Sequence, residues 1–248
     1  MLAEQRFSAI TAILAEQGSV TVKDLVDRLG TSEATIRRDL NALDSGGLLK
    51  KVFGGAVAAE PSVITRDELV ADRFGVEVEA KQAIAGHAAS LVEPGDLVYL
   101  DAGTSTEYLA RAIGRSEATF VTNALALAKV LAAAGCRVYV VGGQFKASTE
   151  AQIGGWAAHE VARYNFTKGF FGTNGVSLSR GFTTPDNEEA LVKGAALSRC
   201  RRAYVLADPS KFGAVSTVTF AAFDQATVLT TTAPDGFREA ENVVEVAS

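Results

Sequence analysis

Six short apolar runs in the later part of the chain constrain its fold more than any other feature. They are LVYLD (97–101), TFVTN (119–123), RVYVVGG (137–143), GFFGTNG (169–175), AYVLAD (203–208) and TVLTTT (227–232). Segments with helical character separate them. Strands this apolar, spaced by helices, are typical of a parallel sheet covered on both faces. We therefore expect a mostly parallel α/β domain over residues 81–248.

Small or polar residues follow these runs. The polar ends are residues 101–106, 122–123, 142–143, 172–175 and 208–211. The carboxyl ends of parallel strands lie along one edge of an open α/β sheet, and ligands bind there at the point where the strand order switches. Five polar ends together favour a ligand pocket at that edge.

The loop DAGTST is the most specific of these ends. Gly103 allows the backbone to approach a ligand, and Thr104, Ser105 and Thr106 bring hydroxyls to the free N–H groups of a helix start. This combination suits a phosphate. Taken alone, the loop is equally consistent with simple helix capping, because it matches no Walker or dinucleotide fingerprint.

The first 57 residues have a different organisation. A helix ending at Gly18 is followed by two short helices joined by a tight turn at Gly30, which is the signature of a helix-turn-helix. The Gly46–Gly47 break, a short strand, the Gly54–Gly55 turn and a return strand come next. A β-hairpin after three helices indicates a winged helix over residues 1–57, whose second motif helix enters the major groove.

The segment TSEATIRRDL (31–40) supplies that second helix. Ile36 and Leu40 begin an apolar stripe, and Arg38 lies about 200° around the axis from Ile36, at roughly 100° per residue. An isolated segment of this kind is equally consistent with a solvated face carrying an Arg37–Glu33 pair. Its place in a helix-turn-helix favours DNA-facing arginines.

The stretch TIRRDLNALDSGGLLKKVFGGAV resembles the helix-turn-helix signature of the DeoR family of bacterial transcriptional regulators, and the resemblance covers residues 3–57. Phe53 departs from it, because the family often has His before the double Gly. In this interpretation Arg37 is shared between a phosphate and Glu33, and the two wing lysines reach phosphates. The predicted DNA-binding residues are Ser32, Thr35, Arg37, Arg38, Lys50 and Lys51.

The later part resembles the family's C-terminal sensor domain, which is similar in fold to ribose-5-phosphate isomerase and glucosamine-6-phosphate deaminase. The matching stretches are DAGTST, VTNAL, VGG, GTNGVS, GFTTPDNEEALVK and LADPSKFG. The resemblance implies a phosphate held by residues 103–106, and Asp101, Asn123, Lys193 and Lys211 facing a sugar. The predicted ligand-binding residues are Asp101, Gly103, Thr104, Ser105, Thr106, Asn123, Gly143, Gly172, Asn174, Lys193 and Lys211. Asp186 and Glu189 are expected to form a capping box that orders the Lys193 helix.

Composition limits the remaining possibilities. The net charge is -5, and residues 1–57 hold seven basic and seven acidic side chains, so only local clustering of cations supports DNA binding. Residues 58–80 carry six acids against two arginines without clear periodicity, and we interpret them as a linker with some local helix. No apolar run approaches the roughly 20 residues of a membrane span. The start lacks a signal-peptide core, and two cysteines and two histidines make no metal set. We expect a cytoplasmic protein without a metal or cofactor.

These features predict a transcriptional regulator, a repressor of sugar catabolism that acts as a homo-oligomer on double-stranded DNA and is released by a phosphorylated sugar. The stretch GTNGVSLSRGFTTPDNEEALVK resembles family members that respond to fructose metabolism, which makes fructose 1-phosphate the first choice of effector. One alternative is a sugar-phosphate isomerase or deaminase with a DNA-binding appendage, using Asp101, Glu189 and Lys193 for acid–base work. A DNA-binding oligomer without a ligand is another, but it leaves the polar strand ends unexplained.

Overall fold

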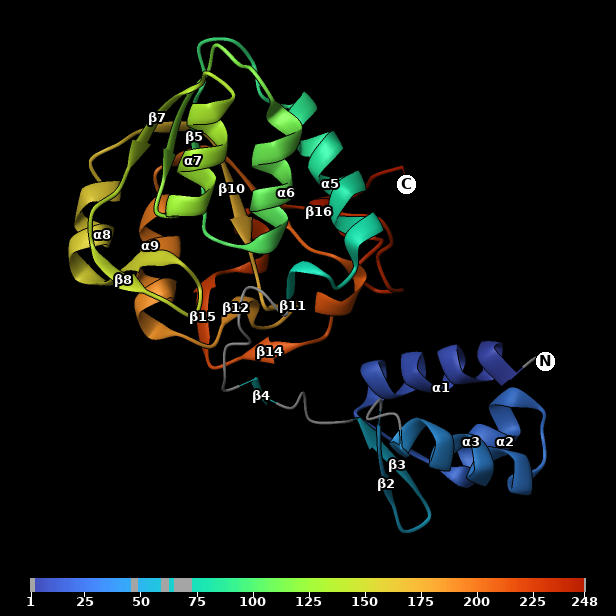
Figure 1. Ribbon diagram of the computed structural model, residues 1–248. Coiled ribbons are helices and arrows are strands. Elements are labelled where there is room, and N and C mark those ends of the chain that lie inside the picture. Colours follow the sequence, from blue (N-terminus) through green and yellow to red (C-terminus); the bar gives the residue numbers. More distant parts are fainter. Residues whose placement is uncertain (1–2, 46–48, 59–62, 65–72, 248) are drawn as a thin grey trace. The chain divides into compact units, whose positions relative to one another are not determined.

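The computed structural model describes residues 3–45, 49–58, 63–64 and 73–247. The chain divides into two compact units, Met1–Ser62 and Val63–Ser248 (Figure 1). The boundary falls inside the range 58–80 that the sequence indicates as a linker, so part of that range belongs to the second unit.

The first unit is a winged helix, as predicted. Its elements are α1 (Ala3–Gln17), β1 (Ser19–Thr21), α2 (Val22–Leu29), α3 (Glu33–Ser45), β2 (Leu49–Val52) and β3 (Gly55–Ala58). The strands form an antiparallel sheet in the order β1-β3-β2. Thr21 caps α2 by accepting from the Asp24 N–H at 3.1 Å, and Gly30 ends that helix in the left-handed conformation. Ile36 and Leu40 are fully buried, as their spacing predicts. The predicted Gly46–Gly47 break lies outside the described residues.

A seven-stranded parallel sheet forms the centre of the second unit. The strands are β5 (Leu97–Leu100), β6 (Thr119–Thr122), β7 (Arg137–Val140), β10 (Phe166–Gly172), β13 (Cys200–Leu206), β16 (Thr227–Thr230) and β17 (Val243–Glu245). Their order is β17-β16-β13-β10-β5-β6-β7, and every neighbouring pair is parallel. The six apolar runs all form strands of this sheet. The strand β17 is an addition that the sequence does not predict.

Helices cover both faces of this sheet (Figure 1). They are α5 (Val78–Ser90), α6 (Thr104–Ile113), α7 (Leu125–Ala133), α8 (Gly154–Val161) and α9 (Asn187–Leu197). Alternation along β5 shows the two layers: Val98 and Leu100 share a buried cluster with α5, α6 and α7, whereas Tyr99 belongs to the cluster that contains α8 and α9. Burial on both faces explains why these strands are apolar throughout.

Smaller elements surround the carboxyl edge of the sheet. They are β4 (Val63–Ile64), β8 (Gln144–Lys146), β9 (Ala151–Ile153), β11 (Gly175–Ser177), β12 (Gly181–Thr184), β14 (Val215–Ser216), β15 (Val218–Ala221) and the 3-10 helices η1 (Pro209–Lys211) and η2 (Phe223–Gln225). The strands β8 and β9 form a hairpin, β11, β12 and β15 form a second sheet, and β4 pairs with β14. No helix within the described ranges is long and apolar enough to cross a membrane.

Candidate effector pocket and DNA-binding surface

The strand order creates a switch point between β5 and β10. From β5 the chain proceeds outward to β6 and β7, and from β10 it proceeds in the other direction to β13, β16 and β17. Doubly wound sheets bind ligands at the carboxyl ends of the strands beside such a point. A pocket lies there. Its lining residues are Arg73, Val76, Lys81, Ala102, Gly103, Thr104, Ser105, Thr149, Gly172, Thr173, Asn174, Glu189, Lys193 and Lys211.

The start of α6 supplies one wall of this pocket. Gly103 is the N-cap residue and offers no side chain to cap the helix. The first N–H groups of a helix have no partner inside it, so those at Thr104 and Ser105 are available to an anion. Both side chains line the same pocket.

Three cations stand beside this helix start: Arg73 precedes α5, Lys81 lies in α5, and Lys211 ends η1. The Lys81 side chain is buried, and its Nζ donates to the Arg73 carbonyl at 2.6 Å. Burial lowers the pKa of Lys81, and the nearby positive charges of Lys211 and Arg73 lower it further. The negative charges of Asp208 and Glu77 act in the opposite direction and raise this pKa. Lys211 is also 3.8 Å from the Asp208 carboxylate. Positive charge is therefore concentrated where the helix dipole favours an anion.

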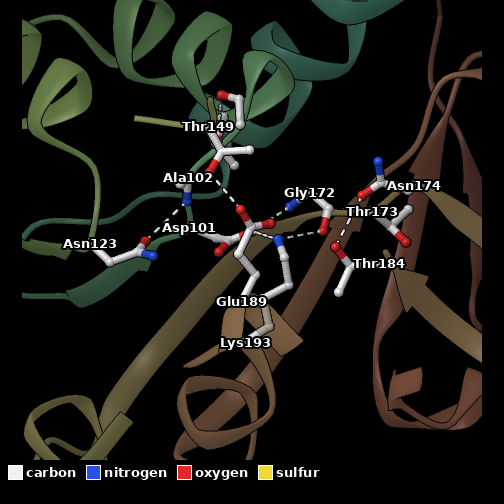
Figure 2. Close-up of polar contacts among 12 residues, drawn as sticks. Asp101, Ala102, Asn123, Thr149, Gly172, Thr173, Asn174, Thr184, Glu189 and Lys193 are labelled. Carbon is white, nitrogen blue, oxygen red and sulfur yellow. Dashed lines mark hydrogen bonds and ion pairs between the residues drawn. The ribbon is translucent and has the colours of Figure 1, made fainter. Parts of the chain in front are cut away.

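A buried ion pair closes the floor of the pocket (Figure 2). The Lys193 ammonium donates to the Asp101 carboxylate and, at 3.1 Å, to the Gly172 carbonyl. The Gly172 N–H donates to the same Asp101 oxygen at 3.1 Å. Burial raises the pKa of Asp101, although Lys193 and the Gly172 N–H act against the rise. These bonds connect the ends of β5 and β10 to α9.

A second polar cluster borders Lys193. The Glu189 carboxylate accepts from Thr149 at 2.5 Å and from Lys146 at 3.0 Å, and Lys146 also donates to Asp186 at 2.9 Å. Asp186 caps α9 by accepting from the Glu189 N–H at 2.9 Å, as predicted. The reciprocal half of the expected capping box is replaced, because the Glu189 side chain binds residues of the β8–β9 hairpin.

Most of the predicted ligand-binding residues meet in this pocket. Those that line it are Gly103, Thr104, Ser105, Gly172, Asn174, Lys193 and Lys211. Asp101 lies directly behind them and is 1% exposed. The amide oxygen of Asn174 accepts from Thr184 at 3.2 Å, which orients that side chain (Figure 2).

The other three predicted residues do not line the pocket. The Thr106 hydroxyl donates to the Gly103 carbonyl at 2.9 Å and so stays within the helix start. The Asn123 amide accepts from the Ala102 N–H at 3.1 Å, which positions the loop after β5 from behind. Gly143 follows the edge strand β7, where an added Cβ would lie 2.9 Å from the Ala157 Cβ, so its small size serves packing against α8.

Sequence reasoning missed several lining residues. Arg73 and Val76 fall in the range interpreted as a linker, and Thr149 comes from a hairpin that no run indicates. The acid-rich composition around Arg73 gave no signal. For Lys81 a signal existed, since it begins the segment with clear helical character.

The candidate DNA-binding surface centres on α3. Ser32 accepts from the Thr35 N–H at 3.2 Å and its hydroxyl is 2.9 Å from that of Thr35, so this pair caps the helix. Arg37 pairs with Glu33 at 2.6 Å, with both side chains exposed. Arg38 is exposed and makes no hydrogen bond or ion pair to the rest of the described chain. Of the predicted helix residues, it is the cation most available to a base.

The wing carries the other predicted contacts. Lys50 is exposed. The Lys51 ammonium donates to the amide oxygen of Asn41 in α3 at 2.6 Å, and the backbone N–H of Lys51 donates to the Asp44 carboxylate at 2.9 Å. Lys51 thus ties the wing to α3. Phe53 is fully exposed at the turn between β2 and β3.

A winged helix joined to an α/β domain with a polar pocket at its switch point indicates a transcriptional regulator. Residues 6–62 match the DeoR-like helix-turn-helix domain and residues 76–233 match the DeoR C terminal sensor domain. The chain belongs to the DeoR family.

Curated relatives agree with this assignment. The chain is 40% identical to the uncharacterized HTH-type transcriptional regulator FruR of Bacillus subtilis, over 95% of this chain and 93% of the relative. It is 32% identical to the lactose phosphotransferase system repressor of Streptococcus mutans, over 95% and 94% of the two chains. These relatives are regulators of transcription, and the family is regulatory. The protein is therefore a transcriptional regulator rather than an enzyme.

Solved structures match parts of the chain at low identity and with low TM-scores. Ribose 5-phosphate isomerase A from Methanocaldococcus jannaschii matches 54% of each chain with a TM-score of 0.41 and 14% identity. The sorbitol operon regulator SorC from Klebsiella pneumoniae matches 83% of this chain and 89% of its own with a TM-score of 0.39 and 13% identity. Neither likeness bears on the ligand of this protein.

Proposed function

We propose that this protein represses sugar-catabolism genes and leaves its operator when a phosphorylated sugar, with fructose 1-phosphate as first choice, occupies the switch-point pocket. The observation that carries the proposal is the meeting of the uncapped α6 start with Arg73, Lys81 and Lys211. Oriented N–H groups and cations together are the chemistry that binds phosphate.

The opposite side of the pocket suits a polyol. Asn174, Glu189 and Lys193 bring amide, carboxylate and ammonium groups to the lining. The ammonium can donate to a sugar hydroxyl, the carboxylate can accept from one, and the amide can do both. The choice of fructose 1-phosphate rests on the resemblance of residues 172–193 to fructose-responsive members of the family, and the name FruR of one relative supports it.

Isothermal calorimetry on the whole protein tests the ligand. Fructose 1-phosphate should bind, free fructose should not, and fructose 6-phosphate, ribose 5-phosphate and glucosamine 6-phosphate rank the alternatives. Replacing Thr104 and Ser105 together by Ala removes two hydroxyl donors, each worth about 1.5–3 kcal/mol toward a charged partner, so affinity should fall by about 100-fold or more. The matched control replaces Ser177 and Ser179, whose hydroxyls are 3.4 Å apart outside this pocket. Equal losses in both double variants would contradict the phosphate assignment.

For DNA, we propose that Ser32, Thr35 and Arg38 lie nearest the bases and that Arg37, Lys50 and Lys51 serve phosphates. Arg38→Ala should weaken operator binding by roughly 1–3 kcal/mol if the guanidinium makes a bidentate base contact. Lys51→Ala should weaken all sequences about equally and lower the salt slope by about 1. Fluorescence anisotropy with operator and scrambled duplexes separates these effects. Arg163→Ala, an exposed arginine of the second unit, is the control.

Assembly follows from the same geometry. A single winged helix contacts one half-site, and paired half-sites require a two-fold protein, so we propose a homo-oligomer held by the second unit. Residues 1–57 expressed alone should sediment as a monomer and bind the operator weakly. Tight binding by this fragment would overturn that arrangement.

A further inference from the structure

Part of the pocket wall comes from the residues of the second unit that lead from the DNA-binding unit to α5; we call them the joining segment, and the structure describes them at residues 63–64 and 73–77. Arg73 and Val76 line the pocket, yet they precede α5 and follow the DNA-binding unit in the chain. Arg73 also precedes residues 76–233, which match the sensor domain. The pocket therefore includes two residues of the joining segment.

Aromatic contacts hold this segment against α6. The Phe74 ring stacks on Tyr108 with ring centroids 4.9 Å apart, and the Tyr108 hydroxyl donates to the Phe74 carbonyl at 3.2 Å. Arg111 lies over the same ring, 5.5 Å from its centroid. Tyr108 and Arg111 belong to α6, whose first turn lines the pocket. The same helix therefore carries the candidate phosphate site and holds Phe74 of the joining segment in place.

The Arg73 side chain lacks a partner that its chemistry requires. Its Nε–H is buried and donates to no group in the described part of the chain, and Arg73 forms no ion pair there. A buried, unsatisfied donor of a charged group is costly. A guanidinium fork matches the oxygens of a phosphate, and an anion bound at the α6 start would satisfy the buried donor.

A second contact reaches the same segment from the other side. Lys211 lines the pocket, and the chain from Lys211 leads within a few residues to β14, which pairs with β4 at Val63–Ile64. The strand β4 is the first element after the DNA-binding unit. The joining segment is thus linked to the pocket at both described ends. Its first strand, β4, pairs with β14, which follows Lys211 in the chain, and its later residues Arg73 and Val76 line the pocket themselves.

We propose that Arg73 binds the anionic group of the effector and that this contact fixes the joining segment, so that occupancy of the pocket is transmitted to the DNA-binding unit. The proposal rests on the proposed function, because it assumes an anionic ligand in this pocket. Arg73 acts on DNA affinity only through the segment that carries it.

The test uses the whole protein with inorganic phosphate as the probe, since phosphate carries the anion without committing to a sugar. Hydrogen exchange read by mass spectrometry should show slower exchange of the amides of residues 74–77 on phosphate addition. Arg73→Met should abolish this protection and weaken phosphate binding by about tenfold or more. Arg111→Met is the matched control: it removes an arginine from the same aromatic ring, its side chain is 56% exposed, and it should keep the phosphate response.

The two proposals can fail separately. Phosphate protection of residues 74–77 that is equal in the wild type and in Arg73→Met, or absent from the wild type, overturns the role of Arg73. If phosphate protects the wild type through Arg73 but no sugar phosphate alters operator binding, the contact between Arg73 and the anion stands, whereas its transmission to the DNA-binding unit and the proposed function both fail. Arg73→Lys keeps the charge without the fork and should give an intermediate affinity for phosphate.

Discussion

Replacing Lys193 by Met should destabilise the second unit strongly. The side chains of Lys193 and Asp101 are 6% and 1% exposed, so the substitution leaves a buried carboxylate with the Gly172 N–H as its remaining hydrogen-bond donor in the described structure. Removing one partner of a buried ion pair costs about 3–5 kcal/mol. For a domain of this size class each kcal/mol lowers Tm by roughly 2–4 °C, which gives a decrease of about 6–20 °C.

Calorimetric melting of the whole protein measures this effect, and Arg163→Met is the control. The Arg163 side chain is 67% exposed and pairs at 3.2 Å with Glu160, which is itself 30% exposed, so its loss should cost no more than about 1 kcal/mol. If Lys193→Met melted within a degree or two of Arg163→Met, the buried carboxylate of Asp101 would not depend on Lys193, and the reasoning would be refuted.

The pH dependence of the stability lost in Lys193→Met tests whether the unpaired Asp101 carboxylate causes that loss. Burial already raises the pKa of Asp101, and loss of the Lys193 ammonium removes the largest opposing influence. A carboxyl whose folded-state pKa lies above its unfolded value of about 3.9 stabilises the fold fully only when protonated, and this contribution is lost as the pH rises through the folded-state pKa. The difference in stability between Lys193→Met and the wild type should therefore shrink as the pH falls from 7 toward about 4. A difference that stays constant or grows would place the defect elsewhere.

Two further substitutions test packing and pairing. Gly169→Ala places a Cβ 2.4 Å from the Cys200 sulfur inside the central sheet and should cost about 1–3 kcal/mol in urea unfolding; a neutral result would contradict the close packing of β10. Arg6→Met leaves Asp39, whose side chain is 5% exposed, without its 2.7 Å ion pair, so the DNA-binding unit should unfold earlier while the second unit melts unchanged. Loss of both transitions together would contradict the independence of the two units.

The fold was largely predictable because its signals are local. The run LVYLD becomes β5 and the spacing of Ile36 and Leu40 becomes the buried face of α3, since each pattern is fixed by burial of the element that carries it. The strand β17 was not predictable from a comparable run. It is short and lies at the edge of the sheet, where Val243 is only partly buried and Val244 is exposed.

The site was predictable only in its local parts. The loop at Thr104 predicts a helix start suited to an anion, and the structure places that helix start in the pocket. Strand order is a tertiary property, so the polar ends at Asn123 and Gly143 could not be separated from those beside the switch point. The side chains of Arg73 and Thr149 enter from a joining segment and a hairpin whose positions depend on the whole fold.

Release of operator DNA by a sugar phosphate is the central claim. The direct measurement is a gel-shift titration of the operator complex with fructose 1-phosphate, with free fructose and the other sugar phosphates in parallel. For release, the effector must bind the DNA-free protein more tightly, and a coupling of about 1–3 kcal/mol would lower operator affinity by about 5- to 150-fold. By reciprocity, DNA must weaken effector binding by the same factor. We predict release by fructose 1-phosphate, none by fructose, and a complex that persists when Thr104 and Ser105 are both Ala. Release by unphosphorylated fructose, or by no member of the panel, would contradict the account.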